Sequence, residues 1–285
     1  MTTDTDGSSA LESIARLADV AKRYDALFCD VWGVVHDGVA KNPQAEAALI
    51  EARASGPRVV LLTNSPRPAA GVRAQLDALG VSHDAYDAIV TSGDATRALI
   101  AAGPAQVFHI GAVRDRDLFD GLALDFADEA RAKVVVATGL TQDEEETPDD
   151  YRDLLARLSA RGLPMICANP DIVVHRGERL IYCAGALAAV YAEMGCTVHL
   201  AGKPHAPIYD VARALLAEVQ PRILCIGDGM FTDVKGANGI DADCLFVADG
   251  IHRDELAPAE GRPEAIAAAL RTHGLHARFV QPALR

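Results

Sequence analysis

Residues 28–35 read Phe-Cys-Asp-Val-Trp-Gly-Val-Val, so a short apolar run ends on the carboxylate of Asp30. A charge at the end of a buried strand is costly unless it is paired or used. Open α/β sheets bind their ligands at the carboxyl ends of their strands. The segment therefore makes Asp30 a candidate nucleophile or metal ligand, although an Asp that caps a strand in a turn gives the same local pattern.

Three further segments end an apolar run, or begin a helix, with side chains that can bind phosphate or metal. They are 59–65 (Val-Val-Leu-Leu-Thr-Asn-Ser), 202–205 (Gly-Lys-Pro-His) and 223–233 (Ile-Leu-Cys-Ile-Gly-Asp-Gly-Met-Phe-Thr-Asp). Their candidate residues are Thr63, Asn64, Lys203, Asp228 and Asp233. Each segment is a weak signal alone, but the four together, in this order, form a specific pattern.

With these motifs the chain resembles the haloacid-dehalogenase-like (HAD) hydrolase superfamily. Within it, the chain is similar to the class IIA branch, which has nitrophenyl- and nucleotide-phosphatase-like members. The phrases Thr-Ser-Gly-Asp at 91–94 and Asn-Pro-Asp at 169–171 add to the resemblance, which runs from about residue 24 to the C-terminus. It implies an α/β fold: a doubly wound parallel sheet, the Rossmann-like core, with an inserted α/β cap domain.

The resemblance assigns Asp30 as the nucleophile, whose carboxylate holds the phosphoryl group as an acyl phosphate that water then cleaves. Mg²⁺ is a hard ion that prefers oxygen ligands. By resemblance it is bound by Asp30, Asp228 and the backbone carbonyl of Trp32, with Asp233 as an outer or water-mediated ligand. Taken alone, Asp228 is also compatible with a turn residue, and Asp233 with a helix cap.

The remaining roles concern the phosphoryl group. By resemblance Lys203 is catalytic: it binds the transferring phosphoryl oxygens and neutralises the nucleophile, whereas a lone surface lysine is usually only solvated. Thr63, with the backbone of Asn64, is expected to hydrogen-bond phosphate oxygens, although a Thr at a strand end is often a turn residue. Asn169 and Asp171 are interpreted as fixing a turn around the intervening proline.

Trp32 departs from the family pattern. The phosphatases usually carry a second Asp two residues after the nucleophile, which acts as general acid for the leaving group and base for the attacking water. A tryptophan cannot transfer a proton there, and such help is typically worth ~10²–10⁴-fold in rate. His36 and His175 are the first alternative proton donors to examine.

Composition limits the classes of partner. The chain has 285 residues, is 50% hydrophobic and carries 27 Lys and Arg against 40 Asp and Glu, a formal charge of −13. Nucleic-acid binding needs a basic footprint, so we expect none. A net-acidic enzyme can still bind phosphate through a local site with metal, lysine and backbone N–H groups. The expected partner is a small phosphorylated metabolite, and the resemblance leaves a homodimer open.

The six cysteines form no Cys-x-x-Cys pair, and several lie in apolar runs, which predicts reduced, buried thiols. The N-terminus lacks the basic start and apolar stretch of a signal peptide, and no apolar run approaches the ~18 residues of a membrane helix. We therefore expect a cytoplasmic protein that does not bind membranes.

Alternating strand and helix patterns predict the elements that must position these residues. Helices are expected at 11–24, 45–54, 68–79, from 147 onward and 183–194, with others starting near 206, 232 and 254. Strands are expected to end at Asp30 and Thr63 and to cover 106–110, 133–137, 164–167, 222–227 and 243–247. The expected domains are 1–19 as an N-terminal tail and helix, 20–87 with 197–285 as the core, and 88–196 as the cap.

The sequence thus predicts a Mg²⁺-dependent hydrolase of a small phosphorylated metabolite that works through an aspartyl-phosphate intermediate. Two alternatives remain at this stage. One is a hydrolase of C–P or C–halogen bonds, whose leaving groups do not need the missing acid. The other is a non-catalytic member that binds a phosphorylated ligand. Metal dependence would distinguish the predicted phosphatase from a dehalogenase, and phosphate release would distinguish it from a non-catalytic binding protein.

Overall fold

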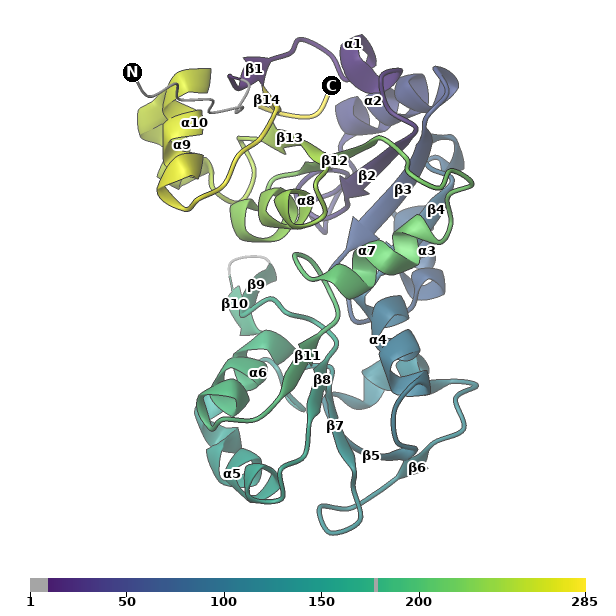
Figure 1. The fold of residues 1–285 in the computed structure, drawn as a ribbon, viewed down its shortest axis with the longest axis vertical. Helices are drawn as coiled ribbons and strands as arrows, with labels where there is room; N and C mark the ends of the chain where they lie inside the picture. The colour runs from purple at the N-terminus through teal and green to yellow at the C-terminus, as the bar shows by residue number, and fades with distance from the viewer. Residues whose placement is uncertain (1–9, 177–178) are drawn as a thin grey trace, which may run out of the picture. The chain divides into compact units, whose positions relative to one another are not determined.

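The computed structural model describes residues 10–176 and 179–285 (Figure 1). The first nine residues of the expected N-terminal segment, 1–19, therefore lie outside the described residues. The chain divides into two compact units, and each is described here by itself. The first unit comprises residues 1–61, 77–88 and 216–285, and the second comprises 62–76 and 89–215. The expected core and cap boundaries remain predictions.

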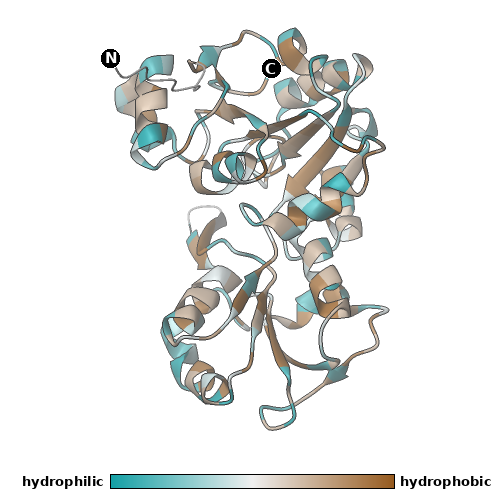
Figure 2. Cartoon of the chain, in the orientation of Figure 1, coloured by the Kyte–Doolittle hydropathy of each residue, from teal (hydrophilic) through white to brown (hydrophobic). Residues whose placement is uncertain are grey.

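Among the described residues, one sheet has seven strands in the order β1-β14-β13-β12-β2-β3-β4. Its strands are β1 (Glu12–Ser13), β2 (Ala26–Asp30), β3 (Arg58–Thr63), β4 (Ala88–Thr91), β12 (Ile223–Gly227), β13 (Asp243–Val247) and β14 (Phe279–Gln281). Strand β12 pairs in parallel with β2 on one side and β13 on the other. All residues of β2 and β12 are buried, as expected for a parallel sheet covered on both faces, and Figure 2 shows these strands as hydrophobic. The predicted doubly wound, Rossmann-like core is confirmed.

Helices connect these strands. They are α1 (Ala18–Ala21), α2 (Pro43–Ala54), α3 (Ala69–Ala78), η1 (His83–Ala85), a π-helix η4 (Met230–Val234), α8 (Lys235–Gly239), α9 (Arg253–Leu256), η5 (Ala257–Ala259) and α10 (Pro263–Thr272). Asn42 caps α2, because its side chain accepts hydrogen bonds from the backbone N–H groups of Gln44 and Ala45.

The predicted helix over residues 11–24 is wrong. Glu12 and Ser13 instead pair in parallel with Phe279 and Val280 at the edge of the sheet, and the only helix in this stretch is the single turn α1. The apolar spacing that favoured a helix is still used for packing, since Leu17 and Val20 are buried. Pairing with the C-terminal strand, remote in sequence, overrides the local pattern. Strand β14 thus places residues 279–281 inside the sheet, between β1 and β13.

The second unit holds a five-stranded parallel sheet, within the described residues, in the order β11-β8-β7-β5-β6. Its strands are β5 (Gln106–Ile110), β6 (Asp125–Phe126), β7 (Val134–Ala137), β8 (Met165–Cys167) and β11 (Val198–Leu200). Separately, β9 (Val173–Arg176) pairs in antiparallel orientation with β10 (Arg179–Tyr182). Its helices are α4 (Ser92–Ala101), η2 (Val113–Phe119), η3 (Pro148–Tyr151), α5 (Arg152–Ala160), α6 (Ala184–Glu193) and α7 (Ala206–Arg213).

Strand β7 shows why this sheet forms. Val135 and Ala137 belong to one apolar cluster, whereas Val134 and Val136 belong to another, so alternate residues are buried on opposite faces. The sequence predicts that the chain leaves the cap near residue 197. At that point the chain forms β11, which pairs with β8 in this sheet.

None of the six cysteines forms a disulfide bond, and five of them are buried, as predicted. Among the described residues, no helix combines the length and apolar character needed to cross a membrane.

Candidate active site

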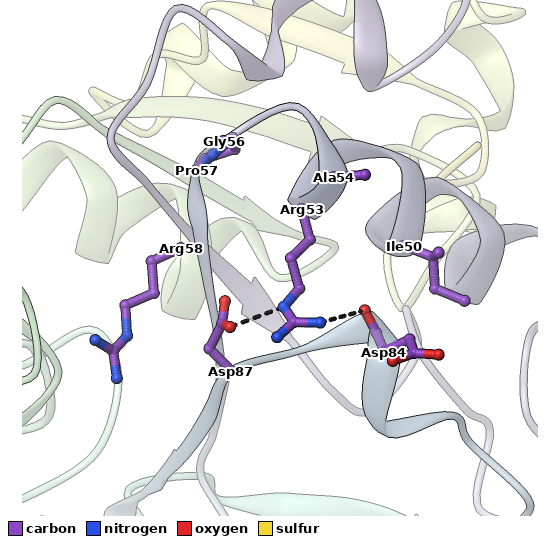
Figure 3. A pocket seen from close by; sticks show the side chains of 8 residues that line it. All are labelled: Ile50, Arg53, Ala54, Gly56, Pro57, Arg58, Asp84 and Asp87. Carbon is purple, nitrogen blue, oxygen red and sulfur yellow. Dashed lines mark hydrogen bonds and ion pairs between the residues drawn. The ribbon is translucent and has the colours of Figure 1, made fainter.

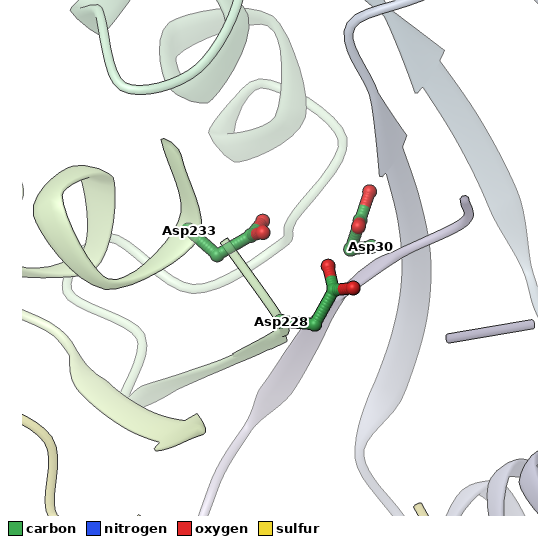
Figure 4. Close-up of side chains that lie close together, drawn as sticks. All are labelled: Asp30, Asp228 and Asp233. Carbon is green, nitrogen blue, oxygen red and sulfur yellow. The ribbon is translucent and has the colours of Figure 1, made fainter. Parts of the chain in front are cut away.

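Three buried carboxylates of the first unit lie together (Figure 4). Asp30, Asp228 and Asp233 each offer an oxygen, and these oxygens all lie within 4.8 Å of one another. The residues are 7%, 5% and 4% exposed. In the described part of the chain, no other group of three or more His, Cys, Asp or Glu side chains is close enough to share a metal ion.

Two neighbouring strands and a π-helix bring the carboxylates together. Asp30 is the last residue of β2, and Asp228 directly follows β12, which pairs with β2 in register Cys29 opposite Ile226. Asp233 comes from the π-helix η4, where its Oδ2 accepts hydrogen bonds from the backbone N–H of Gly229 at 3.1 Å and from the Thr232 hydroxyl at 3.3 Å. Single π-turns of this kind are frequent at functional sites.

Two glycines allow the backbone to approach Asp228 closely. A Cβ at Gly33 would lie 2.4 Å from Asp228 Oδ2, and Gly33 also has φ +84°, a conformation that favours glycine. A Cβ at Gly250 would lie 2.1 Å from the same oxygen. The backbone N–H of Ile251 then donates to Asp228 Oδ2 at 2.9 Å, which fixes the carboxylate.

This donor set fits a hard divalent cation. Three carboxylates so close together repel one another, and a cation with oxygen ligands offsets that repulsion. Sites for softer metals usually contain sulfur or imidazole donors, and this set contains neither. The Trp32 carbonyl, two residues after Asp30, remains a predicted ligand.

The Trp32 side chain is 47% exposed, and its indole lies edge-on to His36 with ring centroids 6.1 Å apart. His36 is 3% exposed, and its Nδ1 accepts a hydrogen bond from the backbone N–H of Gly38 at 2.9 Å. Burial lowers the pKa of His36, which favours the neutral ring. The other alternative proton donor, the side chain of His175, lies outside the described part of the chain.

The predicted phosphate-binding residues belong to the second unit, where two of them are joined. The Asn64 amide accepts from the backbone N–H of Lys203 at 2.7 Å and donates to the Lys203 carbonyl at 3.1 Å. It also donates to Asp171 Oδ1 at 2.9 Å. Lys203 is only 3% exposed, whereas a lysine that only contacts solvent is usually mostly exposed. Thr63 is next in the chain to Asn64, and its hydroxyl accepts from the backbone N–H of Ser65 at 3.2 Å.

Sequence reasoning assigned only the backbone of Asn64 and missed that its side chain joins Asp171 to Lys203. The Asn-Pro-Asp motif was the available signal, but it does not indicate that Asn64 is the hydrogen-bond partner of Asp171. The expected turn is present: the backbone N–H of Asp171 donates to Asn169 Oδ1 at 3.0 Å.

A second polar cluster of this unit lies at the carboxyl ends of β5 and β7. The Thr138 hydroxyl donates to Asp115 Oδ2 and contacts His109 Nε2, each at 2.9 Å. Burial, and then the charge of Arg116, lower the pKa of His109 to about 4. Burial raises the pKa of Asp115.

A cavity of about 670 Å³ belongs to the first unit and is not lined by the carboxylates (Figure 3). It lies near the end of α2 and the start of β3. Arg53 donates there to Asp87 at 2.7 Å and to the Asp84 carbonyl at 3.2 Å, so its charge is already compensated. The chemistry of the first unit therefore centres on the carboxylates.

Comparison with known proteins agrees with this geometry. A family model described as haloacid dehalogenase-like hydrolase matches residues 27–125, and a second HAD-hydrolase-like model matches residues 200–273. A haloacid dehalogenase-like hydrolase from Brucella suis is 48% identical, with a TM-score of 0.82, and the match covers 95% of this chain and 99% of that one. This chain belongs to the haloacid dehalogenase-like hydrolase family.

More distant relatives are phosphatases. The D-glycerol 3-phosphate phosphatase of Mycobacterium tuberculosis is 28% identical over 259 residues, a match to 83% of this chain and 66% of that protein. A glycerol phosphate phosphatase structure from that species in complex with magnesium has a TM-score of 0.65 at 27% identity, covering 81% of this chain and 70% of the other. A 4-nitrophenylphosphatase from Thermotoga maritima is 25% identical, with a TM-score of 0.71 and coverage of 93% and 96%. The expected nitrophenylphosphatase-like branch is thereby confirmed.

Proposed function

We propose that the protein is a Mg²⁺-dependent phosphatase that hydrolyses a small phosphorylated metabolite through an aspartyl phosphate on Asp30. The observation that carries the proposal is the buried cluster of Asp30, Asp228 and Asp233. The phosphatase relatives, one of them solved with magnesium, support it.

In this proposal Asp228, the Trp32 carbonyl and one oxygen of Asp30 would hold the ion, with Asp233 as an outer or water-mediated ligand. When bound, Mg²⁺ offsets the negative charge of the carboxylates and of the phosphate. The free oxygen of Asp30 forms a bond to phosphorus, and the bond from phosphorus to the leaving oxygen breaks, with its electron pair going to that oxygen. Water then attacks the aspartyl phosphate, which releases inorganic phosphate and regenerates Asp30.

Lys203, Thr63 and Asn64 complete the proposal as the phosphoryl-binding residues. Lys203 supplies a positive charge for phosphoryl oxygens, and its backbone is held by the hydrogen bond that it donates to the Asn64 amide and the one that it accepts from it. Thr63 supplies a hydroxyl donor. The Asp171 carboxylate orients the Asn64 amide and is a positioning residue.

The test is phosphate release from a panel of phosphomonoesters, with Mg²⁺ and after EDTA treatment. We expect release with Mg²⁺ and its loss with EDTA. Asp228→Ala should weaken Mg²⁺ binding measured by calorimetry and lower the release, whereas Asp210→Asn, at an exposed position of α7, should change neither. Unchanged Mg²⁺ affinity in a folded Asp228→Ala variant would remove Asp228 from the site. Dehalogenation without metal would favour the alternative hydrolase.

A further inference from the structure

Three large apolar side chains are exposed in the segments of the first unit that carry or contact the carboxylates. Trp32 is 47%, Phe231 46% and Ile251 71% exposed. Side chains of this size are usually stabilised by burial. Several of them exposed around one site are typical of a surface that binds another molecule.

Each of the three is tied to the carboxylate cluster by the chain itself. Trp32 follows Asp30 by two residues, and Phe231 lies in the π-helix that carries Asp233. Ile251 donates its backbone N–H to Asp228. The apolar groups therefore come from three separate segments that also build the carboxylate cluster.

The two aromatic rings are held in place. Phe231 is packed edge-on between two histidines, with ring centroids 5.8 Å from His252 and 5.0 Å from His273. Such edge-to-face contacts favour a fixed ring orientation. A ring that is fixed while still half-exposed is prepared to contact another molecule at little further entropic cost.

Trp32 is held in a similar way. Its indole lies edge-on to His36, and a Cβ at Gly38 would lie only 3.1 Å from the indole Cζ2. Gly38 also has φ +89°, a conformation that side chains rarely adopt. Gly38 therefore leaves room for the Trp32 indole to lie against the backbone of this loop.

We propose that Trp32, Phe231 and Ile251 form the contact surface for the organic group of the substrate, and that this group is apolar or aromatic rather than a polyol. The inference rests on the proposed function, because it takes the carboxylate cluster as the place where phosphate binds. A surface of two rings and a branched aliphatic chain gains affinity by covering apolar area, whereas the hydroxyl groups of a polyol gain nothing from it and lose their water.

The probes are two phosphonates that differ in the group attached to phosphorus. Benzylphosphonate presents an aromatic ring, and 2-hydroxyethylphosphonate presents a hydroxyl. Both lack the ester oxygen, so their affinities do not depend on a leaving group. We expect benzylphosphonate to bind with Mg²⁺ at least about tenfold more tightly, which corresponds to burying part of one ring. The affinities are measured by calorimetry and by inhibition of phosphate release from 4-nitrophenyl phosphate.

Variants assign the preference to these side chains. Phe231→Ser and Ile251→Ser should each reduce the affinity ratio of the two phosphonates about threefold or more, and Phe231→Leu should retain most of it. Val219→Ser is the matched control, because Val219 is 98% exposed in the same unit and should leave the ratio unchanged.

The outcomes separate the two proposals. Equal affinities, tighter binding of the hydroxyethyl compound, or an unchanged ratio in both serine variants would overturn the apolar contact surface. Loss of the ratio in the Val219→Ser control would do the same. If no phosphomonoester releases phosphate, the proposed function fails, and the calorimetric ratio still decides whether the surface prefers an aromatic group.

Discussion

The side chain at position 32 sets what the proposed reaction can do. A tryptophan there leaves no carboxyl group to protonate the leaving oxygen, and the neighbouring His36 is buried with a lowered pKa. A leaving group without a proton must depart as an anion. Aryl phosphates, acyl phosphates and anhydrides do so readily, whereas simple alkyl phosphates do not.

We therefore predict that the rate depends steeply on the pKa of the leaving group. The measurement is a series of phosphate esters at saturating Mg²⁺. Hydrolysis of the aspartyl phosphate should also be slow, since its water lacks a base, and Trp32→Asp should raise activity on alkyl phosphates by up to ~10²-fold. A flat dependence, with chemistry shown to be rate-limiting, would mean that His36, His175 or another residue donates the proton.

At the scale of elements, the sequence predicted the strand ends and most of the connecting helices, but it missed the first strand and the π-helix. The apolar runs that end at Asp30 and before Asp228 are continuous because parallel strands are buried on both faces, so periodicity and order located them. The pairing of β1 with β14 depends on contacts between residues remote in sequence. The π-helix around Asp233 depends on one extra residue in a helical turn. No local pattern encodes these features.

Gly250 gives a test of the element that fixes Asp228. A methyl group at Gly250 would lie 2.1 Å from Asp228 Oδ2 and must displace the carboxylate. We predict that Gly250→Ala lowers Mg²⁺ affinity by calorimetry on the order of tenfold, as disturbed support of a metal ligand does. Gly139→Ala is the control, since a Cβ there meets no atom within 4 Å. Wild-type affinity in a folded Gly250→Ala protein would show that the carboxylate position matters little.

The cluster at the ends of β5 and β7 predicts a pH dependence of stability. His109 has a folded pKa of about 4, below its ordinary value of 6.5. Above pH 6.5 the ring is neutral in both states; as the pH falls toward 4, the unfolded chain binds a proton that the folded chain does not, so stability falls. After allowance for partial exposure, we predict a loss of about 1 kcal/mol between pH 7 and pH 5.

His109→Gln isolates this contribution, because glutamine does not titrate and Asp115 remains in both proteins. Unfolding free energies from urea titrations should fall less between pH 7 and pH 5 in the variant than in the wild type. Equal losses in the two proteins would mean that the imidazole takes up its proton in the folded state.

At the scale of the whole molecule, the candidate residues are distributed over both compact units. The carboxylates belong to the first unit, whereas Asn64, Lys203 and Asp171 belong to the second. Motif order predicted both groups, because each motif follows an apolar run. It did not predict the bond between Asn64 and Asp171, which joins residues 107 positions apart.

This distribution predicts that metal binding and turnover are separable. Lys203→Met replaces a buried lysine by an uncharged side chain of similar length. We predict Mg²⁺ affinity within about twofold of the wild type, since the carboxylates stay intact, but phosphate release reduced about 10²-fold or more. Calorimetry and steady-state assays provide the two values. Retained turnover would remove Lys203 from the reaction, and parallel loss of metal binding would contradict the division of roles.

The most direct test of the central claim is to trap the intermediate. The protein is mixed with 4-nitrophenyl phosphate and Mg²⁺, quenched in acid and digested, and its peptides are analysed by mass spectrometry. We predict a phosphate adduct on Asp30 that requires Mg²⁺ and is absent from Asp30→Asn, which should also lose phosphate release by about 10³-fold or more. An adduct on another residue, or undiminished release by Asp30→Asn, would contradict the account.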